Sequence, residues 1–108
     1  MTNVINIKET FKDDTISREA GERLRLLIIE NLKTANNVTI DFHDTIIAST
    51  SFFDEGFAKL ALTGWSSSDF HQKINIKNMN QKDHDVLVMI CKNRKLLINI
   101  KPLIINPK

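Results

Sequence analysis

The most informative segment of the chain is Val38–Phe42, which reads VTIDF, followed by Ser49–Ala58, which reads STSFFDEGFA. Apolar β-branched and aromatic residues alternate with polar ones in the first part, and this pattern predicts a strand. The second part places three hydroxyls before an apolar stripe at helical spacing, which predicts a helix that begins near Phe52. The free N–H groups at a helix start bind a capping side chain or an anion. The function of the segment therefore depends on whether its hydroxyls cap the helix or accept a phosphate.

The other predicted elements alternate between strand and helix. On the N-terminal side we expect a strand over 3–8, a turn or a short second strand around Phe11, and a helix over 18–34 capped by Ser17. On the C-terminal side we expect the second helix to end near Gly64 and a loop to follow over 66–68. After this loop we expect a strand over 73–77, a helix that is capped by Asn80 and has Asp83 in its first turn, and an extended segment over 96–105. This order predicts an α/β fold in which helices cover a mixed sheet.

Composition indicates a single globular domain over residues 1–108. Hydrophobic residues make up 42% of the chain and charged residues 26%, which is typical of a folded protein. No apolar run approaches the roughly 18 residues of a membrane span, and the N-terminus lacks the basic start and apolar core of a secretory signal. The single cysteine, Cys91, has no partner within the chain for a disulfide. We therefore expect a cytoplasmic location and no membrane association.

Charge is distributed unevenly along the chain. Residues 1–70 hold seven basic and eleven acidic residues, a net charge of −4, and residues 71–108 hold eight basic and two acidic residues, a net charge of +6. One interpretation is a set of solvated strand edges and helix ends. The alternative is a nucleic-acid-associated accessory protein that uses Lys92, Arg94, Lys95 and Lys101. The chain has no Tyr and its six Phe fall mostly at core spacing, which argues against a stacking surface for nucleic acid.

The sequence contains no catalytic or cofactor motif that we can identify. The three histidines have no metal-ligand spacing with one another or with Cys91, and three scattered glycines cannot build a phosphate-binding loop. Asp54 and Glu55 are adjacent on a predicted helix, so they do not share a face that would converge on a substrate. We therefore expect no enzymatic activity, no metal and no cofactor.

The candidate site residues lie around the hydroxyl cluster. Ser51 is predicted to cap the second helix, with Asp54 as the third residue of a capping box. Ser51, Thr50 and Ser49 are at the same time candidate phospho-acceptors or partner-surface residues. Asp41, at the end of the predicted strand, orders the following loop or belongs to the site.

The segment Ile40-Asp41-Phe42 with Ser49–Phe57 resembles the STAS family, the fold of bacterial anti-anti-sigma factors, and more closely the STAS-like domains of the DUF4325 type. The Ser17–Ala20 helix start, the strand at 73–76 and the helix at 86–90 fit the same pattern. The resemblance implies four to five strands with about three helices, no catalysis, and a regulatory role in which the helix after the hydroxyl cluster binds a protein partner.

The resemblance also implies a candidate partner and modification. In the anti-anti-sigma branch, a histidine-kinase-like ATPase phosphorylates a Ser or Thr at this helix start, and Ser51, then Thr50, match that position. The partner would be such an ATPase or another signalling protein, and the chain would be a monomer or a homodimer. The sequence departs from the family pattern in the bulky Phe52-Phe53 pair and in Asp54 and Glu55, whose negative charge we expect to repel a phosphate.

Overall fold

A computed structural model describes residues 2–12 and 14–98 of the chain. Its elements, in chain order, are β1 (Thr2–Asn6), α1 (Ile7–Thr10), α2 (Arg18–Asn31), β2 (Asn37–Asp41), α3 (Thr50–Gly56), the 3-10 helix η1 (Ala58–Thr63), α4 (Ser67–Lys73), β3 (Ile74–Lys77) and α5 (Gln81–Asn93). The predicted α/β fold class is confirmed.

The three described strands pair in parallel in the order β1-β2-β3, so the predicted mixed sheet is not confirmed for this part of the chain. Ile40 on the central strand is in register with Ile5 on one side and Ile76 on the other. The expected four to five strands are not confirmed, because the described residues form three. The predicted last extended segment is only partly described: residues 96–98 are not in a strand, and the rest lies outside the described residues.

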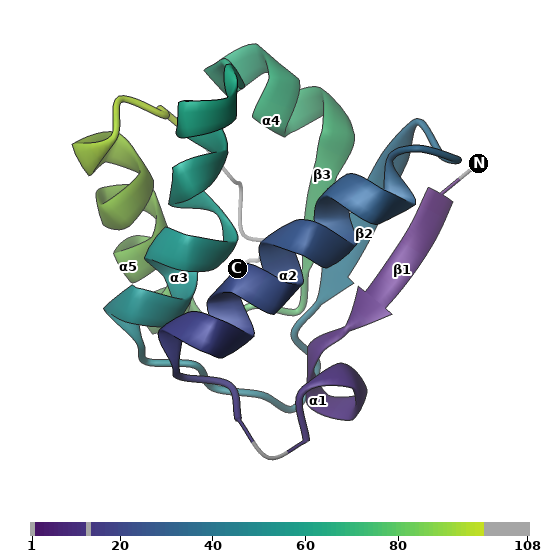
Figure 1. Ribbon diagram of the computed structural model, residues 1–108. Helices are drawn as coiled ribbons and strands as arrows, with labels where there is room; N and C mark the ends of the chain where they lie inside the picture. The colour runs from purple at the N-terminus through teal and green to yellow at the C-terminus, as the bar shows by residue number, and fades with distance from the viewer. Residues whose placement is uncertain (1, 13, 99–108) are drawn as a thin grey trace, which may run out of the picture.

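Helices cover one face of this sheet (Figure 1). β2 alternates buried and part-exposed residues, with Val38 and Ile40 fully buried on the covered face and Thr39 and Asp41 on the other. In Figure 1 α2 lies across the sheet, and α3 lies between α2 and α5. The carboxyl ends of β1 and β2 and the starts of α2 and α3 are found at the same end of the molecule.

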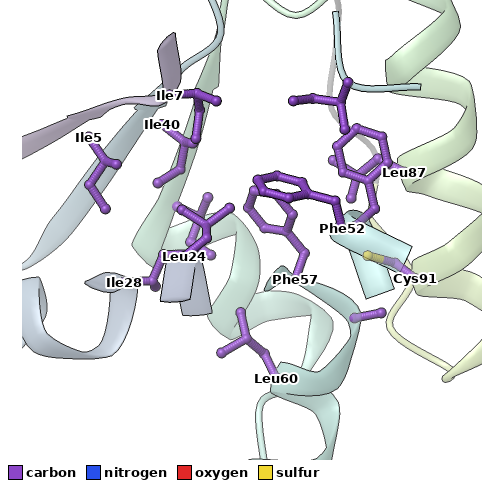
Figure 2. Close-up of a cluster of buried hydrophobic side chains, with 14 of the residues drawn as sticks. Ile5, Ile7, Leu24, Ile28, Ile40, Phe52, Phe57, Leu60, Leu87 and Cys91 are labelled. Carbon is purple, nitrogen blue, oxygen red and sulfur yellow. The ribbon is translucent and has the colours of Figure 1, made fainter. Parts of the chain in front are cut away.

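Aromatic side chains of the α3 segment fill the centre of the core. Phe52 and Phe57 are fully buried and lie between the side chains of the sheet and α2 on one side and Leu87 and Cys91 of α5 on the other (Figure 2). The Phe52 ring meets that of Phe11 edge-on, with the centroids 5.9 Å apart. The Phe52-Phe53 pair, which departs from the family pattern, therefore belongs to the core and not to the outer surface of α3.

The first strand is shorter than predicted, and Phe11 is not in a strand. Asn6 ends β1 and caps the single turn of α1, its side chain accepting a hydrogen bond from the Glu9 N–H at 2.9 Å. The apolar residue Ile7, which extended the predicted strand, is the buried first residue of that helix. The next helix matches its predicted start and its Ser17 cap, and it ends at Asn31, before residue 34.

The predicted helix from Phe52 to Gly64 is two elements. α3 ends at Gly56, and the chain continues as η1 until Gly64, which adopts the left-handed conformation expected of a helix terminator. The predicted loop at 66–68 is wrong, because Ser66 caps α4 and forms a capping box with Asp69. The described residues thus hold five α-helices and not about three.

Candidate functional site

The start of α3 is capped by Ser49. Its hydroxyl accepts a hydrogen bond from the Phe52 N–H at 3.1 Å and donates one to the Ile16 carbonyl at 2.6 Å. The prediction that Ser51 is the cap, with Asp54 in a capping box, is therefore wrong. The helix begins two residues earlier than that prediction requires, because a left-handed Ala48 (φ 50°) turns the chain into the cap at Ser49.

A buried carboxylate of α5 holds the loop that leads to this cap. Asp83, 1% exposed, accepts hydrogen bonds from the Ile47 N–H at 2.8 Å and the Ala48 N–H at 2.9 Å. Asn80 donates to the same carboxylate at 3.0 Å and, as predicted, caps α5. A single side chain therefore fixes the start of α3 against the start of α5, which fixes where the hydroxyl cluster is presented.

Thr50 and Ser51 form the outer part of the hydroxyl cluster. Thr50 is exposed and Ser51 is half-buried, and neither hydroxyl makes a hydrogen bond within the described residues. Ser51 precedes Asp54 by three residues and Glu55 by four, so each of the two carboxylates is a neighbour of Ser51 on the surface of α3. The environment of those two carboxylates consequently decides the charge beside Ser51.

Asp54 is paired with two arginines. Arg94, at the end of α5, donates from Nε at 2.6 Å and from Nη2 at 2.9 Å, and Arg18, at the start of α2, donates from Nη1 at 3.3 Å. Hydrogen bonds first from Arg94 and then from Arg18 hold the pKa of Asp54 below its ordinary value. Asp54 is therefore ionised at neutral pH and joins α3 to both neighbouring helices.

Glu55 is buried and pairs with three cations. Its carboxylate lies 2.8 Å from Lys59 Nζ, 3.0 Å from Arg18 Nη1 and 3.2 Å from Arg25 Nη1, and Arg25 also donates to the Glu55 carbonyl. The pKa of Glu55 is lowered, first by the Lys59 hydrogen bond and also by those of Arg18 and Arg25. Its charge is balanced within the fold.

Together these groups reverse the charge that the sequence indicates. We call Arg18, Arg25, Lys59 and Arg94 the cation cluster. Its four positive charges lie among three carboxylates, those of Asp54, Glu55 and Glu22, the last 4.0 Å from Arg25, which gives a net charge of +1. The Asp54 and Glu55 side chains are only 16% and 10% exposed, whereas Arg18 is 56% exposed. The negative charge that the sequence places beside Ser51 is therefore offset by the paired cations.

A close contact between α2 and α3 brings the arginines to Glu55. Arg18, Gly21 and Arg25 follow one another at spacings of three and four, so they share a face of α2. A Cβ atom at Gly21 would lie 2.7 Å from Glu55 Cβ and 2.7 Å from the Phe52 carbonyl oxygen. Only glycine allows this approach. This arrangement was not predicted from the sequence, although the glycine between two arginines on one helix face is visible there.

Asp41 orders the loop after β2. It accepts hydrogen bonds from the His43 N–H and from the Asn78 side chain, both at 2.9 Å. Two open depressions lie at this end of the sheet. One, of 510 Å³, lies among Asn6, Lys8, Glu9, Lys12, His43 and Asp44; the other, of 420 Å³, among Phe42, Asp44, Thr45, Ile46, Asn78 and Asn80. The α3 hydroxyls line neither of them.

The described residues give little support for a catalytic or a ligand-binding site. Burial raises the pKa of the Cys91 thiol to about 12, with the Asp54 charge adding to the shift, so the thiol is not a ready nucleophile. Within residues 2–12 and 14–98, no three His, Cys, Asp or Glu side chains are placed to hold a metal ion. No helix in this part of the chain has both the length and the apolar character to cross a bilayer.

The basic residues of the C-terminal third lie in different environments. Arg94 is engaged with Asp54, Lys92 and Lys95 are exposed at the end of α5, and Lys101 lies outside the described residues. Of the four residues proposed to bind nucleic acid, only Lys92 and Lys95 are exposed and unpaired with Asp54 within the described residues.

The comparison with family models identifies one match. The model of the STAS-like domain of unknown function DUF4325 matches residues 20–84, which is more than half of the chain and includes α3, Arg25 and Lys59 but neither Arg18 nor Arg94. No curated protein and no solved structure matches the chain. The resemblance inferred from the hydroxyl cluster is confirmed: the chain belongs to the STAS-like DUF4325 family.

Proposed function

We propose that this domain is a non-catalytic regulatory module of the cytoplasm that binds a protein partner through the outer side of α3. The observation that carries the proposal is the contrast between the two sides of this helix. Its inner side is fixed by Phe52, Phe53 and the Gly21 contact, and its outer side presents Thr50 and Ser51 without hydrogen-bond partners in the described residues. A rigid helix with an unengaged polar face is suited to recognition by another protein.

Site-specific crosslinking in the native host tests this proposal. Thr50 is replaced by the photoreactive residue p-benzoylphenylalanine, and Thr34, an exposed threonine in the turn after α2, receives the same residue as the matched control. We expect a discrete crosslinked protein from position 50 that is absent from position 34. An identical pattern from both positions, or no adduct from position 50, would contradict the proposal.

We further propose that the partner is a histidine-kinase-like ATPase and that Ser51 or Thr50 is its phosphorylation site. Family membership supports the partner, and the cation cluster supports the modification because a phosphate adds about −1.5 to −2 charge near groups with a net charge of +1. Ser49 is a poorer candidate, since its hydroxyl is held by the Ile16 carbonyl and the Phe52 N–H.

Intact-mass measurement after incubation with the captured ATPase and ATP tests the modification. We expect a gain of one phosphate that is lost in Ser51→Ala or in Thr50→Ala and retained in Thr34→Ala. An unchanged mass in the wild-type protein would refute the phosphorylation while leaving the binding function in place.

A further inference from the structure

We infer that the outer side of α3 is a docking site for an acidic segment of the partner, held by Arg18 and Arg94 on the two sides of Asp54. The inference rests on the proposed function, because it names the partner's chemistry at the same surface. It does not require Ser51 to be modified.

Both arginines have N–H donors that are not used by Asp54 or Glu55. Arg94 uses Nε and Nη2 for Asp54, and Arg18 uses only Nη1 for both carboxylates. Within the described residues, Arg94 Nη1 and Arg18 Nε and Nη2 make no hydrogen bond. Guanidinium groups bind carboxylates through paired N–H donors. Unused donors therefore lie on both sides of a carboxylate that is itself only 16% exposed.

Charge complementarity favours an acidic occupant. The cation cluster exceeds its three paired carboxylates by one positive charge, and the most exposed of its members, Arg18, lies at the surface between α2 and α3. Such a face attracts acidic segments and repels basic ones. One carboxylate from a partner would complete the neutralisation that Asp54, Glu55 and Glu22 begin.

An exposed apolar side chain next to Arg18 favours a protein occupant over a nucleic acid. Ile16 is 60% exposed, and its carbonyl accepts the Ser49 hydroxyl, so it lies at the start of α3. Ile16 offers an apolar contact that an apolar side chain of a peptide can use and the phosphates of a nucleic acid cannot. The surface thus fits a segment in which an acidic residue lies next to an apolar one.

Arginine side-chain NMR with defined peptides tests this inference. The probe is a fluorescein-labelled peptide of alternating Glu and Leu, and its matched control alternates Gln and Leu. We expect the Glu peptide alone to bind and to shift the Nε–Hε signals of Arg18 and Arg94. Arg18→Gln should weaken binding about two- to fivefold, the range for an exposed charge pair. Lys33→Gln, which removes an equal charge in the turn after α2, should not.

Asp54→Asn should strengthen binding of the Glu peptide, whereas Arg18→Gln should weaken it. Asp54→Asn removes the carboxylate that competes for both arginines, so the Glu peptide should bind about two- to fivefold more tightly. A purely structural role for the network predicts no such gain. Urea unfolding establishes that the variant is folded; if it is not, the comparison of Arg18→Gln with Lys33→Gln decides alone. Equal binding of the two peptides, or tighter binding of a single-stranded oligonucleotide than of the Glu peptide, overturns the inference.

Failure of this inference is distinguishable from failure of the proposed function. If position 50 crosslinks its partner equally in the wild-type and Arg18→Gln proteins, the α3 surface stands and the acidic chemistry is wrong. If position 50 captures nothing that position 34 does not, the proposed function itself is wrong, whichever peptide binds.

Discussion

Replacing Gly21 by alanine tests the close approach of α2 to α3 on which the cation cluster depends. The added Cβ would lie 2.7 Å from the Phe52 carbonyl oxygen and 2.7 Å from Glu55 Cβ. Neither atom is the free end of a flexible side chain, so the helices must move apart. Overpacking of this kind costs about 1–3 kcal/mol. Alanine recovers about 1 kcal/mol of helix propensity. We expect the cost of the clash to lie in the upper part of its range, because both clashing atoms are held in place. After the gain in helix propensity is subtracted, the free energy of unfolding should fall by roughly 1–2 kcal/mol.

Urea unfolding followed by Trp65 fluorescence measures this loss. For a domain of this size the total stability is about 5–15 kcal/mol, so the expected change is readily detected. With an m-value of about 1–3 kcal/mol per M, the midpoint should fall by roughly 0.3–2 M. Separation of the helices should also move Arg18, on α2, away from Arg94 and Asp54, so Gly21→Ala should reduce affinity for the acidic peptide.

Gly56→Ala is the matched control for this clash. A Cβ there would meet the flexible end of Leu24 at 3.1 Å and the Gly21 carbonyl at 3.3 Å, so small adjustments can accommodate it. We expect its midpoint to stay close to that of the wild-type protein. If Gly21→Ala is as stable as Gly56→Ala, or stabilises the domain as alanine does in an isolated helix, the reasoning from the close contact is refuted.

Three further predictions concern the network around α3. Asp83→Asn should lower the free energy of unfolding by about 1–3 kcal/mol, measured in urea, because its amide group cannot accept from both the Ile47 and Ala48 N–H groups. Ala48→Gly should raise the urea midpoint or leave it unchanged, since the left-handed strain of about 1–2 kcal/mol exceeds or offsets the added flexibility of glycine; a clear loss would contradict the strain. The pKa values of Asp54 and Glu55 lie below their ordinary 3.8 and 4.5, so their stabilisation is complete above about pH 4.5 and is lost as the pH falls through the lowered values. The midpoint should therefore fall more between about pH 6 and pH 3 in the wild-type protein than in Asp54→Asn.

Several features could be predicted because their causes are local. The Ser17 and Asn80 caps, the alternation in β2 and the left-handed Gly64 each follow from a few neighbouring residues. Local signals were also overlooked. Ser66 with Asp69 three residues later satisfies the capping-box pattern, yet a run of serines indicates a loop, and the short helix buries only Phe70 as support.

The choice of Ser49 as the cap of α3 could not be derived from local pattern. Three adjacent hydroxyls all suit a helix start, and Ser51 with Asp54 has the better capping-box spacing. The choice is made by partners distant in sequence, because Asp83 holds the preceding backbone and the Ile16 carbonyl receives the Ser49 hydroxyl. These contacts join residues more than thirty positions apart, and sequence spacing carries no information about them.

The sign of the charge at the site is also set by residues distant in sequence, and it has a larger consequence for function. Along the chain, Asp54 and Glu55 follow the hydroxyl cluster with Lys59 as the one nearby base, which indicates an acidic face that rejects phosphate and acidic partners. In the fold, bases from α2, η1 and α5 converge on the pair and cover it, so the surface shown to a partner is positive. The two carboxylates take up part of the charge of Arg18 and Arg94, and the N–H donors that they leave unused are the ones open to a partner. An acidic motif can thus lie within a surface that binds acidic partners, because bases from other parts of the chain outnumber the carboxylates there.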